Sequence, residues 1–399
     1  MKKIEIVKNN IINFILPANS KRRLSIQYIY RLLNNKSNII NLKEKVKEIG
    51  IKKAIKYSFN QLVITTSREY QDVKYKQWIK NNTLTNEELN KQKNEIFEYK
   101  PLISIITVIN NTKIEILNEY LKSIKEQTYD NWELYLLDIS NSKNIQIEQN
   151  SKIQYKKMNN KCISEGYNET LTMIKGEFVS FIKTDDILEK NAFYEIVKEL
   201  NNHKEAEMIY TDEDMFEGNL KNRYNPFFKP DFSPDFLRSN NYIGNFAVIS
   251  TSLINKIGKF RKEFDAVREY DLYLRIMEKT NNIIHIPNVL YHVRKTEVIK
   301  DNTEQLGKEV IQDHLNRLKI AYHDIKSTKQ LGLNLYHIKY KIKGNPLISI
   351  IIPNKDSIKY LNRAVKSILL QSNYKNYEII IVENNSKNRK TFKYYDKIS

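Results

Sequence analysis

The stretch PLISIITVI (101–109) decides the fold, and its first six residues recur in PLISIIIPN (346–354), 245 residues later. The segments that follow are also alike, YLKSIKEQTYDNWELYLLDISNS (120–142) and AVKSILLQSNYKNYEIIIVENNS (364–386). Each joins an amphipathic stretch containing KSI and Gln to a second apolar run that ends in acid and Asn/Ser. Self-similarity of this length indicates a repeated supersecondary unit. The period is too long for a solenoid, so we predict two related domains in tandem.

The bulk composition bounds the class of protein. The 399 residues are enough for two or three domains, and nine glycines and eight prolines exclude collagen-like and low-complexity chains. A single cysteine, Cys162, excludes an internal disulfide and fits a reducing compartment. No apolar run approaches the roughly 20 residues that cross a bilayer. Glu5 and Lys8 interrupt the N-terminal apolar patch, which therefore does not resemble a signal peptide. We expect a cytoplasmic protein.

Positive charge is concentrated near the N-terminus. The chain carries a net charge of +19, and residues 1–100 contribute +12 of it. Residues 1–97 are predicted to form a basic helical extension, with a ragged apolar stripe over 46–59 and a capping box from Thr85 to Glu88. Such an extension could contact an anionic membrane surface, a phosphorylated substrate or nucleic acid, or be a solvated helix face. Without a zinc-finger or RNP-like motif, we expect no nucleic-acid partner.

Strand-like and helix-like stretches alternate after Pro101. ISIITVI (103–109) is the continuous β-branched run of a strand buried on both faces. Helices are predicted at 116–127, 164–174, 188–202 and 268–279, and strands at 132–139, 153–158, 177–182 and 206–214. Alternation of this kind predicts an open, mostly parallel α/β sheet with helices on both faces. We expect an irregular stretch over 221–243 and, over 283–294, a strand pair or a strand-turn-strand around Pro287.

Acidic residues follow several predicted strands, where open α/β sheets bind their ligands. They are Asp138, Asp185, Asp186, Asp212, Glu213 and Asp214. The adjacent pair Asp185 and Asp186 could hold Mg²⁺ or Mn²⁺ beside a diphosphate, or could cap the following helix. His292, in LYHVR, could be a metal ligand or a packed side chain.

Glu269 and Asp271 lie two residues apart in the predicted helix REYDLYLR. Two residues correspond to about 200° on a helix, so the two carboxylates cannot both face one pocket. One of them could act as a general base while the other makes a structural contact. Alternatively, both belong to an exposed charged face with Arg268 and Arg275. The chain contains no GxGxxG, P-loop, GxSxG or CxxC motif.

Taken in order, these segments resemble family 2 glycosyltransferases, which have the nucleotide-diphospho-sugar transferase (GT-A) fold. The resemblance spans Pro101 to Arg294 and includes SIKEQTYDNWELYLLD, GEFVSFIKTDDIL, IYTDEDM, FDAVREYDLYLR and HIPNVLYHVR. Within this family, the chain resembles bacterial two-domain, rhamnosyltransferase-like enzymes of surface polysaccharide synthesis. The resemblance implies a transferase domain over 98–330, a linker over 331–345 and the incomplete start of a second transferase domain over 346–399.

The resemblance also implies roles for the candidate residues. Asp138 would lie near the nucleotide base, Asp185 and Asp186 would bind the cation and diphosphate, and His292 would add a metal or phosphate contact. Glu269 falls where the family places its catalytic base, which implies direct displacement with inversion. The partners would be a nucleotide-diphosphate sugar donor and a glycan or lipid-linked acceptor.

Several positions depart from the family pattern. Lys183 stands where the family has an aspartate, and could pair with a phosphate or repel the metal. Ile139 replaces an aspartate that commonly recognises the base, Asn110 stands where the family has a tyrosine, and Glu269 replaces an aspartate. The alternative to an active enzyme is therefore a catalytically degenerate domain that binds glycan or nucleotide, or scaffolds a partner.

Overall fold

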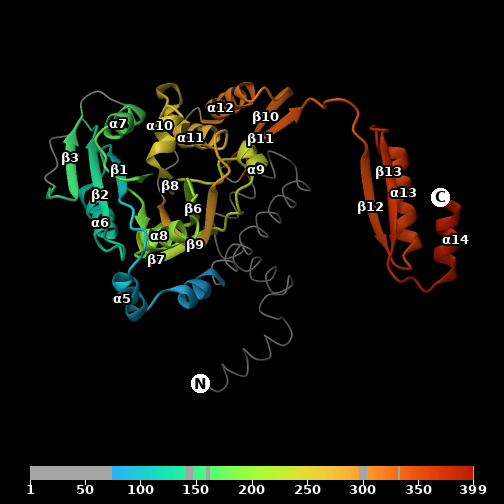
Figure 1. Cartoon of the computed structure of the whole chain (residues 1–399), viewed down its shortest axis with the longest axis horizontal. Coiled ribbons are helices and arrows are strands. Elements are labelled where there is room, and N and C mark those ends of the chain that lie inside the picture. The colour runs from blue at the N-terminus through green and yellow to red at the C-terminus, as the bar shows by residue number, and fades with distance from the viewer. Residues whose placement is uncertain (1–73, 141–146, 159–161, 296–302, 331–332, 399) are drawn as a thin grey trace, which may run out of the picture. The chain divides into compact units, whose positions relative to one another are not determined.

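The computed structural model describes residues 74–140, 147–158, 162–295, 303–330 and 333–398 (Figure 1). The chain forms two compact units. The first comprises the chain up to His314 together with Ser327–Tyr336, and the second comprises Leu315–Lys326 and His337–Ser399. The predicted apolar stripe over 46–59 lies outside the described residues. Within these ranges, no helix is both long and apolar enough to cross a membrane.

A nine-stranded sheet forms the centre of the first unit, in the order β3-β2-β1-β4-β8-β6-β9-β5, with β7 paired to β6. Its strands are β1 Ile103–Ile109, β2 Trp132–Asp138, β3 Ile153–Lys157, β4 Phe178–Phe181, β5 Ile187–Leu188, β6 Met208–Glu217, β7 Asn219–Phe227, β8 Ala247–Ser250 and β9 Ile283–Arg294. The pairs β1–β2, β1–β4, β2–β3 and β6–β9 are parallel. The predicted α/β class with a largely parallel sheet is confirmed.

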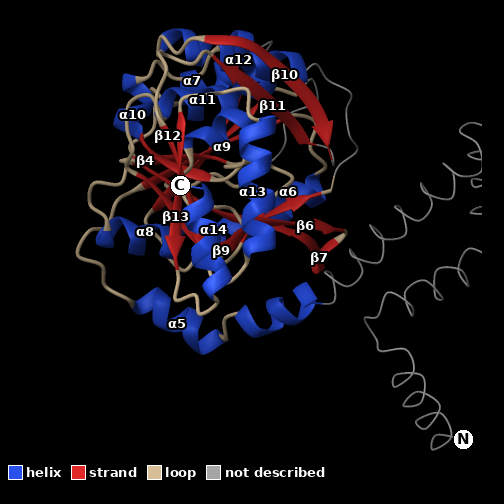
Figure 2. Ribbon diagram, turned by 90° about the vertical axis from the view of Figure 1, so that its right-hand side faces the viewer, coloured by secondary structure: helices blue, strands red, loops and turns tan. Residues whose placement is uncertain are grey.

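Helices flank this sheet (Figure 2). They are α6 Ile114–Lys125, α7 Ile163–Thr170, α8 Ala192–Asn202, α9 Pro234–Ser239, α10 Thr251–Lys256 and α11 Arg268–Ile276. Helix α6 shows why the sequence pattern works, since its buried Leu117, Tyr120 and Ile124 recur at three- and four-residue spacing on one face. All seven residues of β1 are buried, as its continuous apolar run predicts.

The N-terminal segment is helical where it is described. Residues 74–82 form a helix, and α5 Asn86–Asn94 follows. The predicted capping box is confirmed, because Thr85 Oγ1 accepts a hydrogen bond from Glu88 N and Glu88 Oε2 accepts one from Thr85 N at 2.7 Å.

Two expectations about local structure were wrong. Part of the stretch 221–243 forms β7, which pairs with β6 across Gly218 (Figure 2). The expected strand pair around Pro287 is one strand, β9, whose register with β6 shifts between Ile286 and Val289. Proline lacks an amide donor and is tolerated at such a bulge. The expected linker contains β11 Leu333–Tyr340, which pairs with β10 Tyr322–Gln330 after α12 Thr303–Arg317.

The second unit repeats the first βαβ element in detail. Its elements are β12 Ile348–Asn354, α13 Ile358–Gln371, β13 Tyr377–Glu383 and α14 Arg389–Ile398. Ile348 of β12 pairs with Tyr377 of β13, exactly 245 residues beyond the pair Ile103 and Trp132.

Individual hydrogen bonds recur at the same spacing. Ser104 Oγ donates to Glu133 Oε1 at 2.6 Å, and Ser349 Oγ donates to Glu378 Oε1 at the same distance. Their surroundings differ, since β1 is wholly buried whereas Asn354 is the one buried residue of β12. Ile351 of β12, for example, is 63% exposed.

A glycine pair gives a test of packing at the centre of the sheet. A Cβ at Gly176 would lie 2.7 Å from both Leu102 O and Ser104 N, which are backbone atoms that cannot rotate away. We expect Gly176→Ala to lower the free energy of unfolding by about 3 kcal/mol. Gly166→Ala is the matched control, because its Cβ would meet only ordinary contacts at 3.6 Å or more, and should be neutral or stabilise α7 by about 1 kcal/mol. Urea unfolding measures the free energy of unfolding of both variants. Equal changes in the two variants would contradict the role of close packing at Gly176.

Candidate active site

The turn after β4 brings together the loops at the carboxyl ends of neighbouring parallel strands. Thr184 Oγ1 and Thr112 Oγ1 are hydrogen-bonded at 2.6 Å, which joins this turn to the loop after β1. Lys183, Asp185 and Asp186 belong to the same turn. Helix capping by these residues is excluded, because β5 follows the turn and the residue that precedes α8 is Asn191.

Asp186 is buried and anchored to β9. Tyr291 Oη donates to Asp186 Oδ2 at 2.7 Å, and Arg294 N donates to Oδ1 at 2.9 Å. Burial raises the pKa of Asp186 to about 6, against the opposing effects of Lys183 and these hydrogen bonds. The Asp185 carbonyl accepts a hydrogen bond from Arg294 Nε, so β9 fixes both aspartates.

Lys183 is exposed and lies beside the segment that precedes β8. Its Nζ donates to Asn245 Oδ1 at 2.9 Å. Lysine at this position therefore places a positive charge near Asp186 and leaves the ammonium group on the surface of the turn.

Glu213 is an additional candidate that the residue-by-residue reading of the sequence did not select. Its carboxylate lies under Gly244, where a Cβ would come within 2.6 Å of Oε2. The fully buried ammonium of Lys229 donates to Glu213 Oε2 at 3.0 Å and to Ile243 O at 2.6 Å. The negative charge of Glu213 contributes to the raised pKa of Asp186, which places the two carboxylates in one neighbourhood. The sequence signal was its place among the acids expected to end the strand 206–214, but β6 continues to Glu217 and Glu213 lies within it.

Glu269 and Asp271 diverge on α11, as their spacing predicted. Glu269 lies 3.1 Å from Arg268 Nε. Asp271 is fully buried between Arg275, at 2.6 Å, and Arg261. Asp271 therefore has a structural environment, and of the two candidate bases only Glu269 is partly open to solvent.

Asp138 lies at the end of β2 and is fully buried. Burial opposes its charge, yet hydrogen bonds hold the pKa of Asp138 below its usual value. The donors are Ser140 N at 2.9 Å, Tyr155 Oη at 2.8 Å and Lys157 Nζ at 3.0 Å. The carboxylate thus holds Ser140 and two side chains of β3 at the end of β2. Its predicted contact with a nucleotide base stays a prediction.

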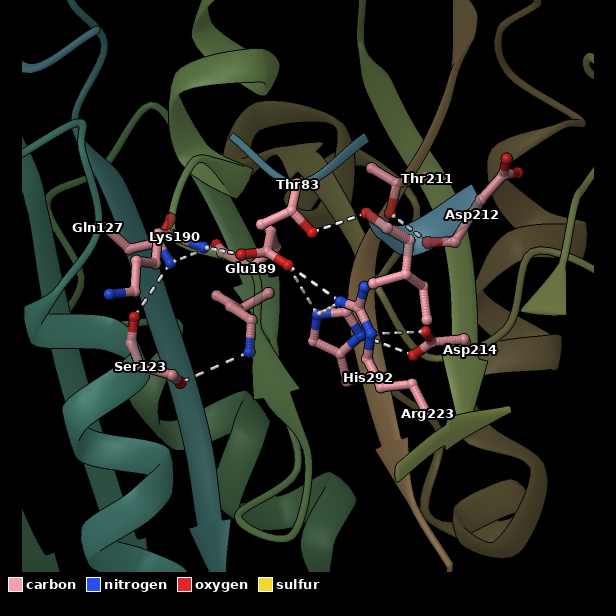
Figure 3. Close-up of polar contacts among 12 residues, drawn as sticks. Thr83, Ser123, Gln127, Glu189, Lys190, Thr211, Asp212, Asp214, Arg223 and His292 are labelled. Atoms are coloured by element: carbon pink, nitrogen blue, oxygen red, sulfur yellow. Dashed lines mark hydrogen bonds and ion pairs between the residues drawn. The ribbon is translucent and has the colours of Figure 1, made fainter. Parts of the chain in front are cut away.

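His292 lies on the other side of the sheet from Asp186. Its Nδ1 is 2.6 Å from Asp214 Oδ1, and its Nε2 is 3.3 Å from Glu189 Oε2 (Figure 3). Arg223 completes the cluster, with Nη1 3.1 Å from Glu189 Oε2 and Nε 3.3 Å from Asp214 Oδ2. Both ring nitrogens therefore face carboxylates. The structure does not bring His292 together with Asp185 and Asp186 as a metal site.

The pairing of β6 with β9 explains this separation. Glu213 pairs with Tyr291, and Asp214 pairs with His292. Successive side chains of a strand point to opposite faces, so Glu213 and Tyr291 face Asp186 while Asp214 and His292 face away. Tyr75 of the N-terminal segment donates to Asp214 Oδ2 at 2.5 Å on that second face.

A divalent cation fits the two aspartates only if the donor supplies further ligands. Among the described residues, no group of three His, Cys, Asp or Glu side chains is arranged to hold a metal ion. Mg²⁺ in phosphate-transfer sites commonly takes one or two carboxylates together with substrate phosphates. Asp185 and Asp186 match that donor set.

The buried histidine predicts a pH-dependent stability. Burial lowers the pKa of His292, but Asp214 and Glu189 outweigh it and raise the pKa above 6.5. A raised pKa contributes stability below about pH 6.5, and this is lost as pH rises through the folded-state value. We expect His292→Gln to lower the free energy of unfolding by about 3 kcal/mol at pH 6 and by less at pH 9.

Urea unfolding across this pH range measures the effect on stability. His203→Gln is the control, because the side chain of His203 is 45% exposed, and it should change the free energy of unfolding by less than about 0.5 kcal/mol. A destabilisation by His292→Gln that grows with pH would contradict the ion-paired histidine.

Comparisons with known proteins identify the family of the chain. The sequence profile of glycosyl transferase family 2 matches residues 104–258 and 349–398. The O-antigen biosynthesis protein RfbC of Myxococcus xanthus is 31% identical over 73% of this chain and 24% of its own length. The uncharacterized protein y4gI of Sinorhizobium fredii is 30% identical over 75% of this chain and 34% of its own. The chain thus spans about a quarter to a third of the length of these relatives.

Among solved structures, S. aureus TarS 1–349 in complex with UDP-GlcNAc is similar, with a TM-score of 0.42, 16% identity and coverage of 54% of this chain and 66% of that one. The first unit is a mixed α/β fold with a largely parallel central sheet. With the profile matching both copies of the repeated unit, the chain belongs to glycosyl transferase family 2.

Proposed function

We propose that this protein transfers a sugar from a nucleotide-diphosphate donor to a glycan or a lipid-linked acceptor during cell-surface polysaccharide synthesis. The observation that carries the proposal is the arrangement of the turn after β4 and the neighbouring part of β6. There Asp186, Glu213 and the exposed Lys183 lie on one face of the sheet, in a family 2 glycosyltransferase. The relative named for O-antigen biosynthesis supports the class of product.

In this proposal, Asp185 and Asp186 hold Mg²⁺ or Mn²⁺ together with the donor phosphates. A bound cation offsets the negative charge that develops on the departing nucleotide diphosphate. Lys183 contributes a positive charge from the same turn, and its hydrogen bond to Asn245 directs the ammonium along the edge of the site. Asp138, at the end of β2, lies near the nucleotide base in this proposal.

Glu269 is the proposed general base. It accepts the proton of the acceptor hydroxyl as that oxygen attacks the anomeric carbon, so the reaction inverts the configuration there. Arg268 Nε lies 3.1 Å from Glu269 Oε1, and the Glu269 side chain is partly open to solvent. Asp271 stabilises α11 through its ion pairs with Arg261 and Arg275, and takes no part in the proton transfer.

A second candidate is a degenerate domain that binds nucleotide or glycan without turnover. The observation in its favour is the hydrogen bond between Lys183 and Asn245, which keeps an ammonium group beside the proposed cation site. The proposal also includes the acceptor and a peripheral contact between the basic extension and anionic lipid. The lysines that would make this contact are Lys43, Lys45 and Lys47, which lie outside the described residues.

Nucleotide binding tests the proposed donor site. We expect UDP, dTDP or GDP to bind the purified chain more tightly with Mn²⁺ than without it, as measured by calorimetry. The double variant Asp185→Asn, Asp186→Asn should lose the Mn²⁺-dependent part of the affinity, because neutral amides are poor ligands for a hard cation. Asp130→Asn removes an exposed carboxylate elsewhere and serves as the control. Absence of binding by a folded chain would refute the donor site.

Turnover tests the roles of the two α11 carboxylates. With the donor identified by calorimetry, Glu269→Gln should reduce kcat by about 10²–10⁴-fold and leave nucleotide affinity unchanged. Asp271→Asn should instead lower the free energy of unfolding by about 3 kcal/mol, since it breaks buried ion pairs. Nucleotide release and urea unfolding measure these effects. Turnover at the unaltered rate by Glu269→Gln would remove Glu269 from the mechanism.

A further inference from the structure

A pocket of about 240 Å³ lies between the N-terminal segment and the transferase unit. Arg223 lines the pocket and forms an ion pair with Asp214. Because Asp214 faces away from Asp186, the pocket lies on the opposite face of the sheet from Asp186. Helix 74–82 and the residues after it form another wall. The side chains that matter are Trp78, Glu189, Asn191, Glu195, Arg223 and Asn288.

The aromatic wall is held in place by its neighbours. Trp78 stacks on Tyr75 with ring centroids 5.5 Å apart and planes 18° apart, and meets Phe228 edge-on at 5.5 Å. The Tyr75 hydroxyl is fixed by Asp214. A half-buried indole that is immobilised before binding offers an apolar surface at little entropic cost.

The charges around the pocket leave no excess of positive charge. The guanidinium of Arg223 lies between Glu189 and Asp214, which also flank His292. Glu195 adds a further carboxylate, which accepts a hydrogen bond from Asn191 Nδ2 at 3.1 Å. An anionic ligand such as a phosphate or carboxylate would meet these acids, so the site favours a neutral ligand.

The remaining groups define the chemistry of that ligand. The amides of Asn191 and Asn288 both donate and accept hydrogen bonds, and the carboxylates of Glu189 and Glu195 accept them. Hydroxyl groups satisfy both kinds of partner, and the C–H face of a sugar ring packs on an indole. Pockets for drug-sized ligands occupy about 300–1,000 Å³, so this one suits a single ring.

We propose that this pocket binds one neutral pyranose unit of a glycan, at a site separate from the proposed transfer centre. The role of the pocket rests on the proposed function, in which it would retain the acceptor chain between transfers. The binding itself does not depend on catalysis, because none of the pocket side chains is assigned to the transfer reaction.

Intrinsic fluorescence provides a direct test, because the chain has two tryptophans. Trp132 is buried in β2, so Trp132→Phe leaves Trp78 as the only reporter. This variant of the full chain would be titrated with the methyl glycosides of glucose, mannose, rhamnose and N-acetylglucosamine. We expect at least one to shift the Trp78 emission saturably, with the same affinity in the presence of UDP and Mn²⁺.

Two further variants locate the binding. Asn288→Ala, made in the Trp132→Phe chain, should weaken binding about tenfold, as loss of a paired hydrogen-bonding group would. In the otherwise natural chain, Trp78→Ala should reduce the saturation transferred to the same glycoside in NMR by a similar factor. Asn222→Ala, an exposed amide outside the pocket, is the control for both.

The outcomes separate this inference from the proposed function. No response to any of the four glycosides overturns the inference. Binding that UDP and Mn²⁺ displace, or that Asp185→Asn abolishes while Asn288→Ala retains it, also overturns it and assigns the sugar to the transfer centre. Saturable binding at Trp78 in a chain that binds no nucleotide supports the inference and leaves the proposed transferase function as the part that failed.

Discussion

The parallel pairing of β6 with β9 is the constraint on which the candidate site depends. It sets Glu213 beside Tyr291 and Asp214 beside His292. Because side chains alternate along a strand, one pair faces the site and the other faces the N-terminal segment. Tyr291 then holds Asp186 from one side, while His292 closes a buried ion cluster on the other.

This pairing makes the two faces mechanically interdependent. Any movement of β9 that displaced His292 from Asp214 and Glu189 would also shift the donors to Asp186, which are Tyr291 Oη and Arg294 N. Removing one partner of such a buried cluster leaves an uncompensated charge, so the arrangement is strongly held. The stability of the ion cluster thus fixes the position of an aspartate that is not part of it.

The sequence predicted those elements whose pattern reflects burial. The continuous apolar run 103–109 is β1, and the amphipathic spacing in 114–125 is α6. Strand β7 was missed because most of its residues are exposed, and it forms by pairing with β6 rather than by burying a face. The ion cluster was equally inaccessible, because His292 and Glu189 lie 103 residues apart and only the sheet order brings them together.

The repeated hydrogen bonds between Ser104 and Glu133 and between Ser349 and Glu378 amount to an internal comparison of two homologous sites. Glu133 is a buried carboxylate in the transferase unit and would otherwise merit consideration as a catalytic group. Its counterpart Glu378 keeps the same partner in an exposed setting, outside any site that the structure describes. The comparison of the two units within one chain therefore indicates that Glu133 has a structural role rather than a catalytic one.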